Sequence, residues 1–402
     1  MDGNTPRLLL VTTRNLSAPT GEWRLIANRS AALRSDFKIP TDVLYLRPHT
    51  SPPILLDGSR WSEDLYAIRF SNRVEPRLCS ALLKLRRTIS SWLTRNASGY
   101  VVISGCQLYL APLGIPRERL IVDLHGTLRE WVDGNERAPR DRVLRFAYPL
   151  ASLAERRALE GARGALVVST ALATYARACG VHNVWRIPCG LLRSGVPSES
   201  GRAREEWRNR LSIPADTTAF VYSGGLSKWQ CVREAVLLFG RIRQAWPGKC
   251  RLVIMTPRVE ALSPIVAGLD ASGIRACSVP AEDIGAALCA CDIGLLLRDD
   301  SSTNHNAFPN KFAEYVVAGL FVITSPGLKD ASEFVLRHRV GVLIDPREIR
   351  YGLAAEWVSF LVEAYHGRGS QQQYLARAKA AALDELTMER LVAPFAKSVA
   401  AE

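Results

Sequence analysis

Short apolar runs alternate with longer helical patterns along almost the whole chain. The first series of predicted strands is RLLLVTT (7–13), TDVLYL (41–46), LYAIRF (65–70), YVVISG (100–105), LIVDLHG (120–126), GALVVST (164–170) and VWRIPCG (184–190). The second series is FVYSGG (220–225), RLVIMTP (251–257), ACSVP (276–280), DIGLLLR (292–298), LFVITS (320–325) and VGVLID (340–345). Apolar runs of this length that alternate with helices predict parallel sheets covered by helices on both faces.

A polar segment separates the two series. Residues 191–214, LLRSGVPSESGRAREEWRNRLSIP, are rich in Ser, Gly and Arg. We therefore predict an α/β protein of two doubly wound, Rossmann-like domains, 1–190 and 191–380, which hold a ligand in the cleft between their strand ends. Residues 381–402 end in the helical pattern LTMERLVAPFAKSVAAE, and this helix is expected to pack back on the first domain.

The bulk composition indicates a globular protein without a membrane span. The chain has 402 residues, 48% of them hydrophobic, which suits two domains. No run approaches the roughly 18 apolar residues of a spanning helix, and the first apolar stretch is too short for a signal peptide. Nine cysteines without a CxxC motif predict reduced thiols in a cytoplasmic protein, which we favour over a metal site.

The net charge of +13 is concentrated in the first half. Residues 1–190 carry 27 Lys and Arg against 16 Asp and Glu, whereas residues 191–402 carry 25 against 23. This asymmetry predicts that the first domain contacts something anionic: nucleic acid, an acidic membrane face or a phosphorylated substrate. We expect no nucleic-acid partner, because the sequence contains no recognised nucleic-acid motif.

The segment 76–95 bears on whether the anionic partner of the first domain is a membrane. Its apolar stripe is Leu78, Leu82, Leu85, Ile89 and Trp92, and its flanking cations are Arg77, Lys84, Arg86, Arg87 and Arg95. Such a basic amphipathic helix can lie on anionic lipid. Because the helix connects two predicted strands, we favour burial of the stripe on the sheet, with the cations still able to meet a membrane.

Two strand-to-helix junctions of the second domain are suited to phosphate. In YSGGLSKWQ (222–230), Gly224 and Gly225 allow a close backbone approach, and Lys228 precedes a helix predicted to begin near Trp229. The motif is neither GxGxxG nor a Walker loop, which disfavours dehydrogenases and ATPases. The alternative is a tight turn that requires glycine for structural reasons only.

The second junction is NAFPNKFAEYVVAGLFVITS, from Asn306. Proline suits a helix start and glycine a helix end, and Phe312, Tyr315 and Val316 form one buried stripe. Packing does not account for Lys311, which is placed for a phosphate, or for Glu314, which could accept hydrogen bonds from two sugar hydroxyls. The alternative is that Glu314 faces solvent.

The first domain contributes DLHGTLREW, in which His125 follows a predicted strand. A histidine at the carboxyl end of a strand can be catalytic, although a lone histidine is often structural. Asp299 and Asp300 do not form a D-x-D motif, and we expect a solvated loop there rather than a metal site.

Together these motifs resemble the GT-B glycosyltransferases, specifically the large retaining group called glycosyl transferases group 1. The pattern A-F-P-x-K-x-x-E-Y-x-x-x-G-x-x-V-I after a Y-S-G-G turn carries the resemblance, which is clearest over residues 164–345. It implies two Rossmann-like lobes, a nucleotide diphosphate sugar as donor substrate, no other cofactor and no required metal.

The resemblance also implies roles for individual residues. Glu314 corresponds to the glutamate that holds the ribose, Lys228 and Lys311 lie near the diphosphate, and His125 reaches the donor sugar. The remaining donor-binding positions are Gly224, Gly225, Asn306, Phe308 and Pro309. The sequence departs from the family where Asn306 replaces a second glutamate, where Leu226 replaces a basic residue, and where Cys189 replaces an asparagine.

The expected function is therefore transfer of a sugar from a nucleotide diphosphate sugar to a polysaccharide, glycolipid or lipid-linked acceptor, with retention. The enzyme is expected to be cytoplasmic, with peripheral contact to the inner face of the cell membrane. The alternatives are another GT-B enzyme, such as a nucleotide-sugar epimerase, and a non-catalytic basic binding protein on a degenerate transferase fold.

Overall fold

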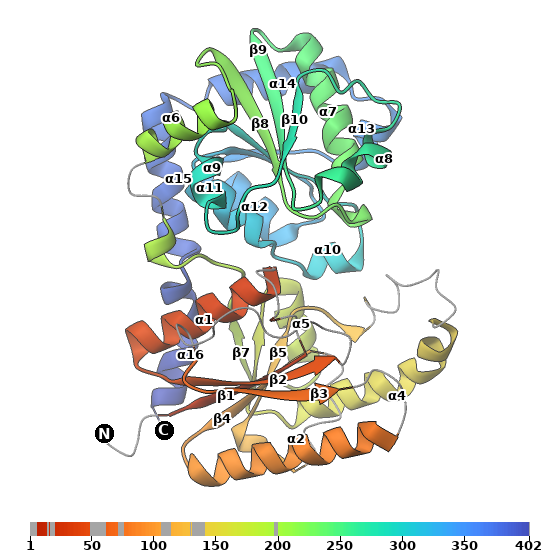
Figure 1. Cartoon of the computed structure of the whole chain (residues 1–402), viewed down its shortest axis with the longest axis vertical. Helices are drawn as coiled ribbons and strands as arrows, with labels where there is room; N and C mark the ends of the chain where they lie inside the picture. The colour runs from red at the N-terminus through yellow and green to blue at the C-terminus, as the bar shows by residue number, and fades with distance from the viewer. Residues whose placement is uncertain are drawn as a thin grey trace. The chain divides into compact units, whose positions relative to one another are not determined.

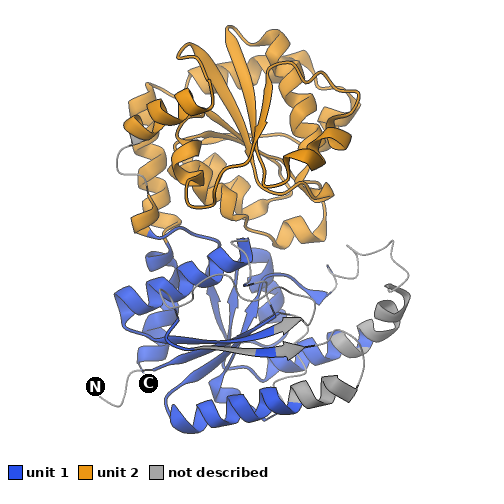
Figure 2. Ribbon diagram, viewed as in Figure 1, with its two compact units in different colours: residues 1–192, 388–402 blue, residues 193–387 orange. Residues whose placement is uncertain are grey.

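The computed structural model describes residues 6–13, 16, 21–48, 62–70, 76–105, 114–128, 130, 141–196 and 200–401. The chain divides into two compact units (Figure 2). Unit 1 comprises Met1–Leu192 and Met388–Glu402, and unit 2 comprises Arg193–Thr387. The sequence-based boundaries were 190/191 and 380/381.

Unit 1 is built on a parallel sheet. Its described strands are β1 (Leu8–Thr12), β2 (Thr41–Pro48), β3 (Leu65–Phe70), β4 (Tyr100–Ser104), β5 (Leu120–Leu124), β6 (Gly164–Val167) and β7 (Asn183–Arg186). They form one seven-stranded sheet of order β3-β2-β1-β4-β5-β6-β7 (Figure 1). Each strand coincides with a predicted apolar run, and β1, β4 and β5 are buried at every position. The order reverses beside β1, as a doubly wound sheet requires.

Helices cover this sheet. Those described in unit 1 are α1 (Gly21–Phe37), α2 (Pro76–Arg95), η2 (Arg117–Arg119), α4 (Asp141–Glu160), α5 (Thr170–Ala178) and α16 (Met388–Ala400).

Helix α2 buries the described part of its apolar stripe, as predicted for a crossover helix. Leu85, Ile89 and Trp92 pack into the core with residues of β1, β2 and β4. The Trp92 Nε1 atom donates a hydrogen bond of 2.5 Å to Asp42 of β2. The flanking cations Lys84, Arg86, Arg87 and Arg95 are exposed. The side chains of Arg77, Leu78 and Leu82 lie outside the described residues.

Helix α16 is the C-terminal helix, and it packs within unit 1 on α1 and β7. The Phe395 ring lies 5.2 Å from the ring of Trp185 in an edge-to-face arrangement. The Met388 backbone N–H donates to the Leu191 carbonyl, so the chain re-enters unit 1 beside the point where it left. The apolar face of α16 is covered by this packing, as an amphipathic helix requires.

Unit 2 repeats the architecture. Its described strands are β8 (Thr217–Ser223), β9 (Lys249–Met255), β10 (Ile274–Cys277), β11 (Ile293–Leu296), β12 (Phe321–Thr324) and β13 (Gly341–Leu343). They form a six-stranded parallel sheet of order β10-β9-β8-β11-β12-β13. The order reverses between β8 and β11. The fold class predicted from the sequence, an α/β protein with two doubly wound sheets and a C-terminal helix, is confirmed.

The described helices of unit 2 are η3 (Arg193–Gly195), α6 (Ser200–Arg210), η4 (Lys228–Gln230), α7 (Val232–Ala245), η5 (Val259–Leu262), α8 (Ser263–Val266), α9 (Ile284–Leu288), α10 (Ser302–Asn306), α11 (Asn310–Val317), α12 (Lys329–His338), α13 (Pro346–Tyr351), α14 (Ala355–His366) and α15 (Gln371–Glu385).

The polar segment 191–214 contains helix α6, whose arginines anchor unit 2. Asp292 precedes β11 and is 8% exposed. Its carboxylate lies 2.6 Å from Arg204 and 3.5 Å from Arg208, and it accepts a hydrogen bond from the Ala219 backbone N–H. Arg208 is itself buried and donates to the Ala290, Pro214 and Thr217 carbonyls. The polar segment at the predicted domain boundary therefore contributes side chains to the folded core of unit 2.

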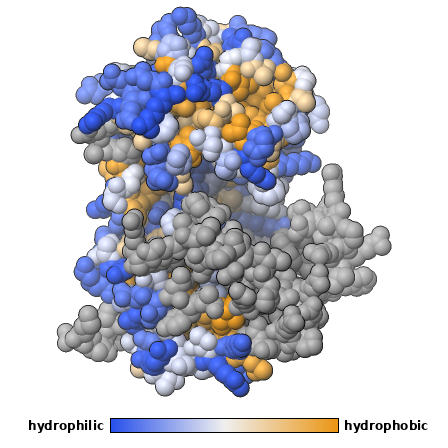
Figure 3. All heavy atoms as spheres, viewed as in Figure 1, coloured by the Kyte–Doolittle hydropathy of each residue, from blue (hydrophilic) through white to orange (hydrophobic). Residues whose placement is uncertain are grey.

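No described helix is both long and apolar enough to span a membrane. On the face shown in Figure 3, hydrophilic residues alternate with hydrophobic ones over the surface of unit 2.

Candidate active site

The site in unit 2 begins where its strand order reverses. Strand β8 pairs with β9 on one side and β11 on the other, and both pairings are parallel. Connections that leave β8 and β11 in opposite directions open a crevice at the carboxyl ends of these strands, which is where doubly wound sheets bind ligands.

Gly224 follows β8 directly and has a φ of +130°. A Cβ atom at this position would lie 2.7 Å from the Lys311 ammonium nitrogen. Its backbone N–H donates to the Met255 carbonyl at 2.8 Å, which fixes the turn beside β9. Glycine is therefore required both by the backbone conformation and by the close approach of Lys311. Gly225, by contrast, is exposed and has open space around it.

Lys311 lies in a group of four residues that we call the cation cluster: Tyr222, Gln230, Arg298 and Lys311. The Lys311 ammonium donates to Gln230 Oε1 at 2.8 Å and lies 4.4 Å from the centre of the Tyr222 ring. Arg298 Nη1 donates to the same Gln230 oxygen. Two cations thus converge on one neutral acceptor.

Neither cation has a carboxylate partner within ion-pair distance among the described residues. Burial lowers the pKa of Lys311 well below its ordinary value, Arg298 lowers it further, and Glu314 opposes the shift. Burial also lowers the pKa of Arg298, whose side chain is only 5% exposed. A buried arginine and a half-buried lysine without a carboxylate at ion-pair distance are costly, and an anionic ligand would compensate both charges.

Glu314 is fixed next to this cluster by helix α11. Pro309 is the N-cap residue of this helix and so lies at the helix start. The next residue after Glu314, Tyr315, accepts a hydrogen bond of 2.8 Å from the Ser223 backbone N–H and so ties α11 to the end of β8. Glu314 is only 9% exposed, which excludes the solvent-facing alternative.

Phe308 is part of the core beneath α11. It is buried, and its ring meets that of Phe312 edge to face at 5.5 Å. Its packing positions the turn from α10 into α11. Asn306 ends α10 and is half-buried.

The Asp299–Asp300 segment is a loop, as expected, in which Asp300 is exposed and Asp299 is half-buried. The buried Asn304 side chain donates to the Asp299 carbonyl at 3.0 Å and to the Asp299 carboxylate. His305 Nε2 lies 2.6 Å from Asp300 Oδ1. The described residues contain no group of three or more His, Cys, Asp or Glu that could hold a metal ion.

Lys228 lies apart from the cation cluster. It begins the 3-10 helix η4 and is exposed, and α7 begins only at Val232. The helix predicted near Trp229 is thus one 3-10 turn. Its third residue, Gln230, supplies the acceptor that Lys311 uses.

His125 belongs to unit 1, immediately after β5. Its Nε2 atom lies 2.9 Å from Asp123 Oδ2, and Asp123 Oδ1 lies 2.9 Å from Arg29 Nη1 of α1. Burial alone would raise the pKa of Asp123, but Arg29 and His125 lower it, so the carboxylate is ionised. The imidazole is 10% exposed and its orientation is set by a buried ion pair.

Sequence reasoning missed Arg298, Gln230 and Tyr222. Arg298 is the last residue of the predicted strand DIGLLLR. Its position at the carboxyl end of a strand was the only feature of the sequence that could have indicated a role in the site. Tyr222 and Gln230 flank the glycine turn on either side, and nothing in the sequence marks their proximity to Lys311.

Neither a protein-family model nor a curated sequence matches this chain. Several solved structures match it in fold. A glycosyltransferase from Rickettsia africae ESF-5 superposes with a TM-score of 0.70 at 12% identity, over 98% of this chain and 99% of that one. This chain has the GT-B glycosyltransferase fold.

Two further structures agree with this assignment. HepE from Anabaena, in a complex with UDP and glucose, gives a TM-score of 0.68 at 16% identity, over 98% of this chain and 100% of that one. Sucrose-phosphate synthase from Thermosynechococcus elongatus gives 0.65 at 14% identity, over 98% of each chain.

Proposed function

We propose that the protein is a retaining glycosyltransferase that moves a sugar from a nucleotide diphosphate sugar to a polysaccharide, glycolipid or lipid-linked acceptor. One observation carries the proposal: the buried Arg298 and the half-buried Lys311 have no carboxylate partner within ion-pair distance among the described residues, and both lie at the reversal point of the unit 2 sheet. A diphosphate is an anion that suits this position. The complex of HepE with UDP and glucose supports this ligand class.

In the proposed mechanism the cation cluster acts on the leaving group. Negative charge grows on the β-phosphate as the glycosidic bond breaks, and Lys311 and Arg298 stabilise it without a metal ion. Because both side chains are already held on Gln230 by hydrogen bonds, little reorganisation accompanies the reaction. The departing phosphate accepts the proton of the acceptor hydroxyl on the same face of the sugar.

Nucleotide release tests the proposal. Purified protein is incubated with a panel of UDP-, GDP- and ADP-sugars, with and without acceptor extracts. Nucleoside diphosphate release that depends on one donor is the expected result. Conversion of the nucleotide sugar without release would indicate an epimerase, and an absence of binding to every nucleotide would contradict the proposal.

Glu314→Gln is expected to weaken donor binding without unfolding the protein. The substitution preserves shape but removes the charge that ribose hydroxyls would bond, a loss of roughly 1.5–3 kcal/mol. Isothermal titration with the nucleoside diphosphate and a melting curve measure both effects. Unchanged affinity would remove Glu314 from the donor site.

His125→Ala is expected to lower turnover much more than affinity for the free nucleotide. In the proposal the imidazole contacts the donor sugar, while the nucleotide is held by unit 2. A neutral imidazole can donate one hydrogen bond and accept another, which suits a sugar hydroxyl. If the role is purely structural, melting temperature and every activity will fall together instead, because Asp123 loses one of its two partners and keeps only Arg29.

We also propose that unit 1 contacts the anionic inner face of the cell membrane. The exposed cations of α2 support this proposal. The described part of the apolar stripe of α2 packs on the sheet, so attachment to the membrane would depend on charge. Co-sedimentation with liposomes should rise with the fraction of anionic lipid and fall with salt. Binding that is independent of both would contradict the proposal.

A further inference from the structure

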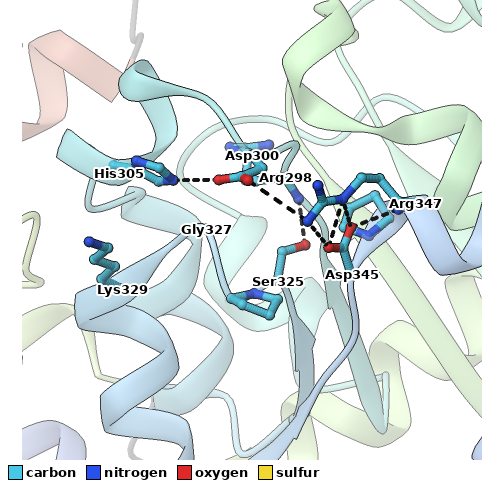
Figure 4. Close-up of a pocket in the computed structure, with 10 residues that line it drawn as sticks. Arg298, Asp300, His305, Ser325, Gly327, Lys329, Asp345 and Arg347 are labelled. Carbon is cyan, nitrogen blue, oxygen red and sulfur yellow. Dashed lines mark hydrogen bonds and ion pairs between the residues drawn. The ribbon is translucent and has the colours of Figure 1, made fainter.

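A cavity of about 260 Å³ opens beside the cation cluster within unit 2. Its walls come from the segments that follow β11, β12 and β13 and from the first residues of α12 and α13 (Figure 4). We call it the α12 cavity. Arg298 lines it, so this one side chain contributes both to the cavity and to the cation cluster. The volume is just below the range of ordinary ligand pockets, about 300–1,000 Å³.

The two carboxylates of the α12 cavity already have partners. Asp345 caps α13 by accepting from the Arg347 backbone N–H, and its other oxygen lies 2.6 Å from Arg347 Nη2. These hydrogen bonds lower the pKa of Asp345, so it is ionised. Asp300 is paired with His305, and Arg347 lies 3.8 Å from its second oxygen. Arg347 therefore neutralises part of the negative charge.

Arg298 and Lys329 are the cations of the α12 cavity that remain uncompensated. Neither forms an ion pair in the part of the chain that the structure describes. Arg298 is nine-tenths buried or more, yet its Nε and Nη2 atoms have no hydrogen-bond partner among the described residues. Lys329 is exposed on the opposite wall (Figure 4). These two nitrogens still reach solvent in the cavity, so they are available to an anionic ligand.

The start of helix α12 adds to the positive potential. Lys329 is its first residue, and no side chain caps the N-terminus at Leu328. The neighbouring Ser325 hydroxyl is already used as the acceptor for the Arg298 backbone N–H, at 2.9 Å. The ten-residue helix therefore begins at the cavity wall beside two cations, an arrangement that favours a carboxylate or phosphate, although Asp330 in its first turn reduces the positive charge.

We infer that the α12 cavity binds a carboxylate on the sugar of the donor, so that the donor is a nucleotide-linked uronic acid. The inference rests on the proposed function. When the diphosphate binds on the Lys311 side of Arg298, the sugar is the next group of the same ligand. The sugar then reaches the side of the Arg298 guanidinium that lines the α12 cavity. A sugar carboxylate there forms ion pairs with Arg298 and Lys329 and accepts from the helix amides.

Isothermal titration of two donors with the same nucleotide tests the inference. The wild-type protein should bind UDP-glucuronate roughly tenfold more tightly than UDP-glucose, as expected for one charge-assisted contact. Lys329→Gln should lower this ratio severalfold, because Arg298 alone then pairs with the carboxylate. Lys249→Gln is the matched control, because it removes the same charge from an exposed site at the amino end of β9 and should preserve the ratio. If GDP rather than UDP binds, GDP-mannuronate and GDP-mannose replace this pair.

The outcomes separate this inference from the proposed function. Tight binding of UDP with equal affinity for the two donors would overturn the uronate assignment and leave the transferase proposal intact. An undiminished preference in Lys329→Gln would likewise overturn it. If glucose 6-phosphate binds together with UDP and is lost in Lys329→Gln, the cavity belongs to an acceptor phosphate instead. Failure of every nucleoside diphosphate to bind would contradict both proposals.

Discussion

Lys311→Gln is expected to lower nucleoside diphosphate affinity by one to two orders of magnitude while leaving the protein at least as stable as the wild type. The lost charge-assisted contact accounts for the affinity, at roughly 1.5–3 kcal/mol. Stability is preserved because the wild-type lysine is a desolvated cation whose hydrogen-bond partner at 2.8 Å, Gln230, is neutral.

The pH dependence provides an independent measurement of the same residue. Burial lowers the pKa of folded Lys311 well below its ordinary value, so the unfolded chain binds more protons there than the folded one. The free energy of unfolding should therefore rise with pH between the lowered pKa and about 10.4, and this rise should be absent in Lys311→Gln. Nucleotide affinity should fall over the same window, because the bound anion requires protonated lysine.

Two outcomes would contradict this assignment. One is nucleotide affinity that is unchanged in Lys311→Gln. The other is an equal loss in Lys249→Gln, whose exposed lysine forms a surface pair with Asp216, since the effect would then reflect net charge alone. Titration calorimetry and chemical denaturation across the pH range supply both quantities.

Asp292→Asn is expected to destabilise unit 2 by about 3–5 kcal/mol. The substitution removes the charge that compensates Arg204 and Arg208, and it leaves Arg208 buried without an ionic partner. It also weakens the acceptor for the Ala219 backbone N–H, which holds the loop before β11 against β8. Because β11 carries Arg298 at its end, nucleotide binding should fall together with stability.

Urea denaturation of Asp292→Asn measures this effect. Asp216→Asn is the control, because it breaks an exposed ion pair with Lys249 and should leave the denaturation midpoint unchanged. Equal midpoints for Asp292→Asn and the control would show that the α6 arginines contribute nothing to unit 2.

The amino-acid sequence by itself determined the strands, the parallel sheets and the helix around Glu314. The apolar runs of the central strands predict buried strands directly, because strands covered on both faces need apolar residues at every position, as in β4, β5 and β11. The edge strands β7 and β10 are only partly buried. The NAFPNKFAEYVVAG segment likewise predicts its own helix, since the residues that start it, bury it and end it are local. The positions of Gly224, Lys311 and Glu314 on unit 2 follow from these elements.

Only the tertiary structure decided which side chains share a site. Lys311 and Arg298 meet at Gln230, which is 81 residues from one and 68 from the other, and no local pattern encodes such a contact. The same holds for the α12 cavity, whose walls come from three successive strand ends. Local sequence fixes backbone conformation through propensity and burial pattern, whereas the lowered pKa of Lys311 arises from the burial that these distant segments create together.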